Sequence, residues 1–80
     1  MTIDPLDATP VYRQIAGVIR GRITSGEIPP RRAIPSEKQL MGEFGAARET
    51  VRKAVKLLRD EGLVEIVQGR GAYVTERGTR

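Results

Sequence analysis

Apolar residues recur at helical spacing in the first part of the chain and predict an N-terminal helix. Between residues 10 and 25 they fall on one helical face, at Val11, Ile15, Val18, Ile19 and Ile23. We expect Thr9 to cap this helix and Pro10 to take its first position, where a missing N–H costs no hydrogen bond. Gly26 stands where a left-handed residue commonly follows a helix, so the pattern predicts an end just before it.

A second, shorter helix is predicted after a proline-rich connector. Residues 26–35 contain three prolines, which exclude a helix and favour an extended segment. Ser36 and Gln39 have the spacing of a capping box, in which each side chain bonds the backbone N–H of the other residue. The apolar residues that follow are Leu40, Met41 and Phe44. We expect this helix to end at Gly45, after about two turns.

The second half of the chain predicts a third helix and a β-hairpin. Over residues 47–60 the apolar positions form one stripe, at Val51, Ala54, Val55 and Leu58. Gly62 is expected to end this helix. Residues 63–67 are a β-branched run of strand length, residues 68–71 hold two glycines, and residues 72–75 supply the returning strand.

The order of these elements defines the expected fold class. Three helices around one aliphatic core, followed by a C-terminal β-hairpin wing, make an α+β fold, mainly α, of the winged helix-turn-helix type. We expect residues 1–8 to be a flexible leader, residues 9–75 to form the domain and residues 76–80 to be a frayed tail. Eighty residues allow one such domain.

Composition narrows the classes of function. The net charge is +4, and eleven of the 14 cationic side chains are Arg, which suits contacts to phosphates and base edges. The absence of Cys and His excludes a Cys/His zinc site, a disulfide framework, a thiol nucleophile and His-based acid–base catalysis. We therefore expect no enzyme activity, no cofactor and no metal. No transmembrane segment or signal peptide is predicted, which favours a cytoplasmic protein.

The most informative stretch is the helix predicted over residues 47–60. At about 100° per residue, four cations fall within an arc of about 80° beside the apolar stripe. They are Arg48, Arg52, Lys56 and Arg59. A cationic face of an isolated helix is commonly just solvated. The neighbouring short helix and the glycine-rich hairpin instead favour a helix that enters the major groove of B-DNA.

The first turns of this helix carry the candidate base contacts. We expect Arg48 and Thr50 to point into the groove. Glu49 is placed to accept a hydrogen bond from a cytosine amino group, and Arg52 to reach a base or a phosphate.

The hairpin turn and the start of the second helix add further candidate contacts. Gln68, Gly69 and Arg70 occupy the turn, where glycine allows close approach of the backbone and the arginine suits a narrow minor groove. An ordinary turn would also use glycine, but its position after a cationic helix favours a wing that contacts DNA. The helix start at Ser36 can hold a phosphate on its free N–H groups, with Lys38 beside them.

Seven short sequence words recur together over most of the chain. They are PVYRQIA (10–16), GEIPP (26–30), IPSEKQL (34–40), FG (44–45), RETVRKA (48–54), EGLV (61–64) and QGRGAYV (68–74). In this order the chain resembles the DNA-binding domain of the GntR family of bacterial transcription regulators, in its HutC-like or YtrA-like branch.

The resemblance implies binding to a palindromic operator in double-stranded DNA as a homodimer, with the isolated domain a monomer or a weak dimer. It implies that the contacting residues are those that match Lys38, Arg48, Thr50, Arg52, Gln68, Gly69 and Arg70.

The chain also departs from the family pattern. Ala46 and Ala47 replace a usual Val-Ser or Val-Thr, which removes a hydroxyl N-cap worth roughly 1 kcal/mol and one phosphate contact. Arg31 replaces a usual Gly, and Ala72 a usual Thr. Family regulators carry a C-terminal domain that binds an effector and forms the dimer. Only about five residues follow the hairpin here, which favours a truncated chain over a naturally short DNA reader.

Together these observations predict sequence-specific binding of double-stranded DNA by a bacterial transcription regulator, a repressor. Residues 47–60 would read the major groove, and residues 68–71 would contact the minor groove. The alternative is a winged-helix interaction module that binds an acidic protein through the same cationic face. RNA binding fits less well, because three aromatic rings offer few platforms for stacked bases.

Overall fold

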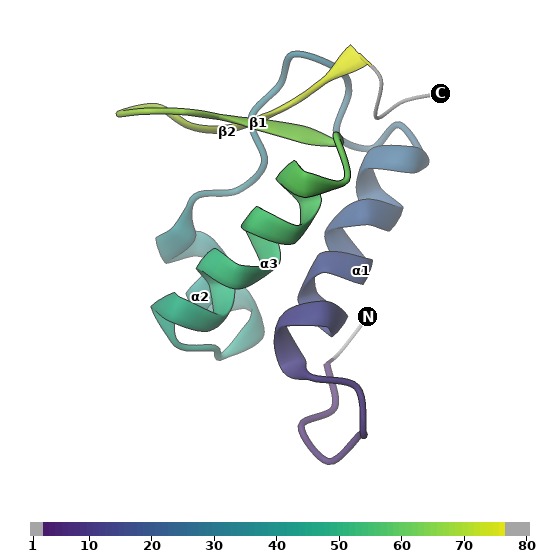
Figure 1. Cartoon of the computed structure of the whole chain (residues 1–80), viewed down its shortest axis with the longest axis vertical. Coiled ribbons are helices and arrows are strands. Elements are labelled where there is room, and N and C mark those ends of the chain that lie inside the picture. Colours follow the sequence, from purple (N-terminus) through teal and green to yellow (C-terminus); the bar gives the residue numbers. More distant parts are fainter. Residues whose placement is uncertain (1–2, 77–80) are drawn as a thin grey trace.

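Three helices and one β-hairpin follow each other in the computed structural model, which describes residues 3–76 (Figure 1). The elements are α1 (Val11–Thr24), α2 (Glu37–Phe44), α3 (Arg48–Asp60), β1 (Val64–Val67) and β2 (Gly71–Val74). The strands pair antiparallel, with Val64 opposite Val74 and Val67 opposite Gly71. This arrangement confirms the winged helix-turn-helix fold. Within the described residues, no helix is long and apolar enough to cross a membrane.

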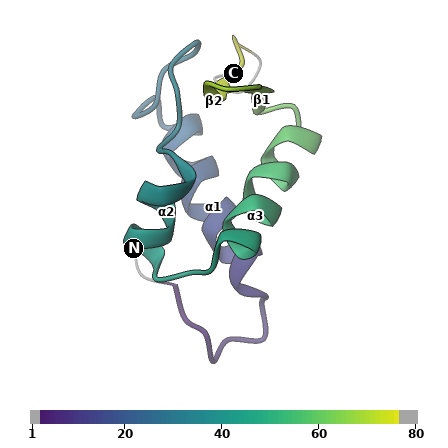
Figure 2. The same ribbon diagram turned by 90° about the vertical axis from the view of Figure 1, so that its left-hand side faces the viewer.

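The core is aliphatic apart from Phe44 and receives side chains from every element. Its members are Ile15, Ala16, Ile19, Ile23, Ile34, Leu40, Phe44, Val51, Ala54, Leu58, Val64, Ala72 and Val74. α1 backs the other two helices, which lie in front of it in Figure 2. The predicted apolar stripes of α1 and α3 are confirmed, although Val11, Val18 and Val55 are only partly buried at the edge of the core.

The proline-rich connector does more than link two helices. Ala33 forms an isolated bridge with Tyr73 of β2. Ile34 N–H donates to the Ala72 carbonyl at 2.9 Å, and Arg31 N–H donates to the Val74 carbonyl at 2.8 Å. The connector is extended, as its prolines predict, but its pairing with β2 was not predicted. This pairing fastens the hairpin to the segment that leads into α2.

The predicted start of α1 is wrong by one residue. Pro10, not Thr9, occupies the N-cap position, and no side chain caps the helix. The backbone of Pro10 is extended (ψ 145°), so its ring lies outside the helix while its carbonyl accepts the N–H of Arg13 at 3.0 Å. The Thr9 N–H is turned toward the Asp7 carboxylate at 2.7 Å, and its carbonyl accepts the Gln14 side-chain amide.

The helix ends around the α2–α3 turn match the sequence prediction closely. α2 ends at Gly45, which has a left-handed backbone with φ 61°. α3 starts after Ala47, which makes no side-chain cap hydrogen bond, as expected for a residue without a hydroxyl. Gly62 follows α3 with φ 79°. The short, sharply turned link between α2 and α3 therefore depends on glycine at position 45.

The residues ahead of α1 hold a defined path where the structure describes them. Gln14 bonds both backbone groups of Asp4, at 2.6 and 2.7 Å, and Ile3 packs against the core. The predicted leader (1–8) includes residues 1–2, and the predicted frayed tail (76–80) includes residues 77–80. Those six residues lie outside the described part of the chain.

Candidate nucleic-acid interface

The candidate contacts gather on one side of the molecule. α2, the N-terminal end of α3 and the hairpin turn all lie toward the left of Figure 1, and Figure 2 views them from that side. Seven of the eight predicted residues are exposed, namely Lys38, Arg48, Glu49, Arg52, Gln68, Gly69 and Arg70. The eighth, Thr50, is half-buried. The fold thus leaves the predicted contacts open to a partner.

Arg48 and Arg52 share one carboxylate that comes from the neighbouring helix. Arg52 Nε donates a hydrogen bond to Glu37 Oε2 at 2.9 Å, and Arg48 Nε lies 3.8 Å from Glu37 Oε1. The hydrogen bond and the negative charge of Glu37 raise the pKa of Arg52, which therefore stays cationic. The side chains of Arg48 and Arg52 remain 61% and 49% exposed. One carboxylate therefore orients both guanidinium groups and leaves outward N–H donors uncovered.

Glu49 and Thr50 face a partner less directly. Glu49 Oε1 lies 3.6 Å from Arg52 Nη1. A cytosine amino group at Glu49 would therefore compete with Arg52 for the carboxylate. Thr50 lies about 160° around the helix from Arg52. It can meet DNA only from the end of α3, not across its cationic face.

The start of α2 combines a complete capping box with an exposed lysine. Gln39 N–H donates to Ser36 Oγ at 3.1 Å, and Ser36 N–H donates to Gln39 Oε1 at 2.8 Å. The N–H groups of Glu37 and Lys38 have no acceptor within the helix, because they belong to its first turn. Among residues 3–76, Lys38 makes no ion pair. Two N–H groups and one ammonium can therefore face a phosphate here.

The wing tip is shaped by glycine conformation rather than by crowding. Gly69 and Gly71 have φ 81° and φ 112°, values that L side chains rarely adopt, although a Cβ at either position would meet nothing within 4 Å. Arg70 N–H closes the turn on the Val67 carbonyl at 2.9 Å. The Arg70 side chain is exposed and has no ion pair in the described part of the chain. It can therefore approach a phosphate or a groove.

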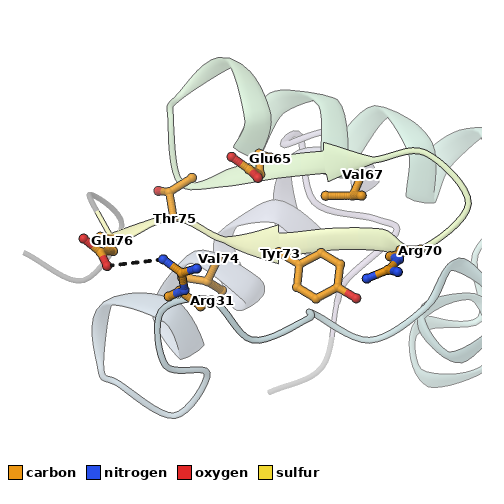
Figure 3. A pocket seen from close by; sticks show the side chains of 8 residues that line it. All are labelled: Arg31, Glu65, Val67, Arg70, Tyr73, Val74, Thr75 and Glu76. Carbon is orange, nitrogen blue, oxygen red and sulfur yellow. Dashed lines mark ion pairs between the residues drawn. The ribbon is translucent and has the colours of Figure 1, made fainter.

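The outer face of the hairpin is a different kind of surface (Figure 3). A shallow hollow of about 410 Å³ lies there. Arg31 pairs with Glu76 at 3.9 Å at one end, and Arg70 lies beside Tyr73 at the end next to the turn. Glu65 lines the same hollow. Because acidic and basic groups alternate on this face, it offers no continuous cationic track, in contrast to α3.

The role of Glu37 was not predicted from the sequence. Its contact with Arg52 joins residues 15 positions apart in the sequence and exists only because α2 packs on α3. The one available signal was a carboxylate at the start of a helix next to a predicted cationic helix. Lys56 was predicted on the cationic face but not as a DNA contact, and it is exposed.

Comparisons with known proteins identify the family and the fold. The family model described as bacterial regulatory proteins, gntR family, matches residues 11–74. The mannosyl-D-glycerate transport/metabolism system repressor MngR of Escherichia coli K12 is 48% identical over 67 residues, which are 84% of this chain and 28% of that protein.

Two solved structures share the fold. AraR(DBD) in complex with operator ORX1 matches with a TM-score of 0.85 and 39% identity over 94% of this chain and 93% of that chain. YtrA from Sulfolobus acidocaldarius, a GntR-family transcription factor, matches with a TM-score of 0.83 and 39% identity over 92% of this chain and 78% of that chain. The chain spans less than a third of the length of the curated relatives MngR of E. coli and NagR of Bacillus subtilis.

Proposed function

The chain belongs to the GntR family of bacterial regulatory proteins, and on this basis we propose that it reads operator DNA for a transcriptional repressor. Its relatives support this proposal, since MngR and NagR are named repressors and AraR(DBD) is seen with an operator. The relatives are transcriptional regulators rather than enzymes, which supports the expectation of no catalysis.

One observation carries the proposal above all others. Arg48 and Arg52 stand in the first two turns of α3, exposed and oriented by a shared carboxylate from α2. Arginine presents a planar pair of donors that matches the O6 and N7 acceptors of guanine in the major groove. α3 is anchored by the fully buried Val51, Ala54 and Leu58, so it can present these donors at a fixed angle.

We assign the other contacts to positions around α3. Lys38 and the free N–H groups of α2 hold a phosphate, and Glu49 and Thr50 border the bases at the start of α3. Gln68, Gly69 and Arg70 enter the minor groove. Two copies bind a palindromic operator as a homodimer, and the chain on its own is a monomer or a weak dimer. The protein acts in the cytoplasm.

The test is a selection of duplexes from a random pool, followed by affinity measurements on the selected duplex and on a scrambled one. We expect the selected site to be palindromic. Arg48→Ala should lose roughly 1–3 kcal/mol of the preference for the selected duplex. The matched control is Arg59→Ala, since Arg59 lies in the last turn of α3 and pairs with Asp60 at 3.2 Å.

Two results would overturn the proposal. The first is a wild-type chain that binds selected and scrambled duplexes equally. The second is a loss of preference that is the same for Arg48→Ala and Arg59→Ala. Either result would favour the alternative function, in which the cationic face of α3 binds an acidic protein.

A further inference from the structure

A hollow of about 460 Å³ separates α3 from the hairpin on the side that carries the candidate contacts. Its apolar part includes Val55 of α3 and Ile66 and Ala72 of the hairpin. Its charged lining consists of three cations and two carboxylates, namely Arg52, Lys53, Lys56, Glu37 and Glu49. The hollow therefore combines an apolar floor with a charged lining that is positive on balance. A ligand for it must offer apolar surface and negative charge close together.

Ile66 is unusual among the large apolar side chains of the fold. It is 47% exposed, whereas its cross-strand neighbour Ala72 is only 8% exposed. Among residues 3–76, the other exposed large apolar side chain is that of Leu6, which precedes α1. Ile66 is thus open to a partner within the hollow rather than packed in the core.

Lys53 and Lys56 are the cations of α3 without a carboxylate partner among residues 3–76, and they differ in that the Lys53 ammonium lies 5.8 Å from the centre of the Tyr12 ring. Arg48, Arg52 and Arg59 each lie within 4.0 Å of a carboxylate oxygen. Lys56 has no such partner among residues 3–76, and it is exposed beside Ile66. Its ammonium group is therefore available to an anion without loss of an existing ion pair.

We propose that this hollow receives the sugar-phosphate backbone of one DNA strand, with Lys56 holding a phosphate and Ile66 packing on the adjacent deoxyribose. The proposal rests on the proposed function. If α3 occupies the major groove and the wing occupies the neighbouring minor groove, the strand that separates the two grooves must pass between them. A deoxyribose and its phosphate supply the apolar surface and the negative charge that the hollow calls for.

The salt dependence of binding tests the lysine. Each phosphate contact contributes about 0.9 to the slope of log affinity against log salt on B-DNA. Lys56→Gln should reduce that slope by about 0.9 on the selected and on the scrambled duplex alike. Arg20→Gln removes the same charge from α1, where Arg20 is paired with Glu61 outside the hollow, and should leave the slope nearly unchanged.

Neutral linkages locate the contact. Duplexes with a single methylphosphonate should weaken wild-type binding at one linkage between the two contacted grooves, and the Lys56→Gln variant should show no further loss there. Ile66→Thr keeps a β-branched side chain and should weaken binding severalfold on both duplexes without changing the salt slope.

The outcomes separate this proposal from the one it rests on. Equal slopes for Lys56→Gln and Arg20→Gln, or losses that add at every neutral linkage, would overturn the backbone site even if the selected duplex is still preferred. Absence of any preferred duplex would instead count against the proposed function. The slope on scrambled DNA would still decide whether Lys56 contacts a phosphate.

Discussion

Two groups of arginines on this domain meet carboxylates in different ways. On α1, Arg20 binds Glu61 with two hydrogen bonds, at 2.8 and 2.6 Å, and Arg22 binds both oxygens of Glu43. On α3, Arg48 and Arg52 share a single residue, Glu37, and Arg48 Nε approaches it no closer than 3.8 Å.

This difference suggests that the ion pairs of Arg20 and Arg22 stabilise the fold, whereas Arg48 and Arg52 belong to a binding surface. The side chains of Arg20 and Arg22 are 38% and 23% exposed, and their paired geometry ties α1 to the end of α3 and to α2. The side chains of Arg48 and Arg52 are more open. Glu37 lies near the Nε atom of each, and Glu49 lies 3.6 Å from Arg52 Nη1, so these contacts leave other guanidinium donors uncovered. Arg20 and Arg22 therefore use their hydrogen-bond donors within the fold, whereas Arg48 and Arg52 have donors available to a partner.

Arg52→Ala should give the largest effect, and only on binding. We expect roughly 1–3 kcal/mol less discrimination between the selected and the scrambled duplex, because a bidentate base contact is lost. The free energy of unfolding should change by no more than about 0.5 kcal/mol, as for most surface substitutions. Binding titrations and urea melts of the same protein sample measure both. A large drop in stability with unchanged discrimination would reverse the assignment.

Arg20→Ala should show the opposite pattern with a smaller effect. Its bidentate pair with Glu61 is partly exposed, so we expect a loss of about 0.5–1 kcal/mol in the free energy of unfolding. Discrimination between duplexes should stay as in the wild type. Glu61→Gln should give a similar loss, since it breaks the same contact. If Arg20→Ala lowered discrimination as much as Arg52→Ala, the two groups of arginines would not differ in role.

Glu37→Gln should give a smaller effect of a distinctive kind. Removing a carboxylate from the binding face strengthens attraction to any duplex, while Arg48 and Arg52 lose the group that orients them. We expect affinity for scrambled DNA to rise and the ratio of selected to scrambled affinity to fall severalfold. Glu65→Gln, on the outer face of the hairpin, controls for the change in net charge. An equal fall in the ratio for both variants would rule out an orienting role for Glu37.

The fold was largely predictable because its signals are local. The stripes of α1 and α3, the capping box at Ser36 and Gln39, and the glycine turns each depend on residues a few positions apart. The start of α1 was misplaced because the backbone of Pro10 is extended (ψ 145°), which puts Pro10 at the N-cap rather than in the first turn. The pairing of Ala33 with Tyr73 spans 40 positions. It was not predicted, because prolines indicate an extended segment but not the strand with which that segment pairs.

For the candidate site, the exposure of the predicted residues followed from the sequence, but the contacts among them did not. Periodicity placed Arg48 and Arg52 on one exposed face, and the structure keeps them there. The link to Glu37 arises from the angle at which α2 packs on α3, which no spacing within one helix encodes. Ile66 was read as part of a β-branched strand. The sequence does not show that its side chain is exposed, because the exposure depends on how the hairpin packs beside α3.

The smallest predicted effect is a loss of folding stability at acid pH. The hydrogen bond from Arg22 lowers the pKa of Glu43 below its ordinary value of 4.5. The folded state thus binds a proton at Glu43 less readily than the unfolded state. The resulting stabilisation is full above the ordinary value and is lost as the pH falls through the lowered one. Because Glu43 is 37% exposed, solvent screens the pair and the effect is modest.

Urea melts near pH 7 and near pH 3 measure it as a difference between variants. Glu43→Gln should be less stable than the wild type near neutrality, and the gap should narrow in acid. Glu27→Gln is the matched control, because Glu27 lies 3.9 Å from the same Arg22 without a hydrogen bond. Its gap to the wild type should stay small at both pH values. A gap for Glu43→Gln that does not depend on pH would mean that the pair with Arg22 adds no stability, and the contrast between α1 and α3 would then rest on binding alone.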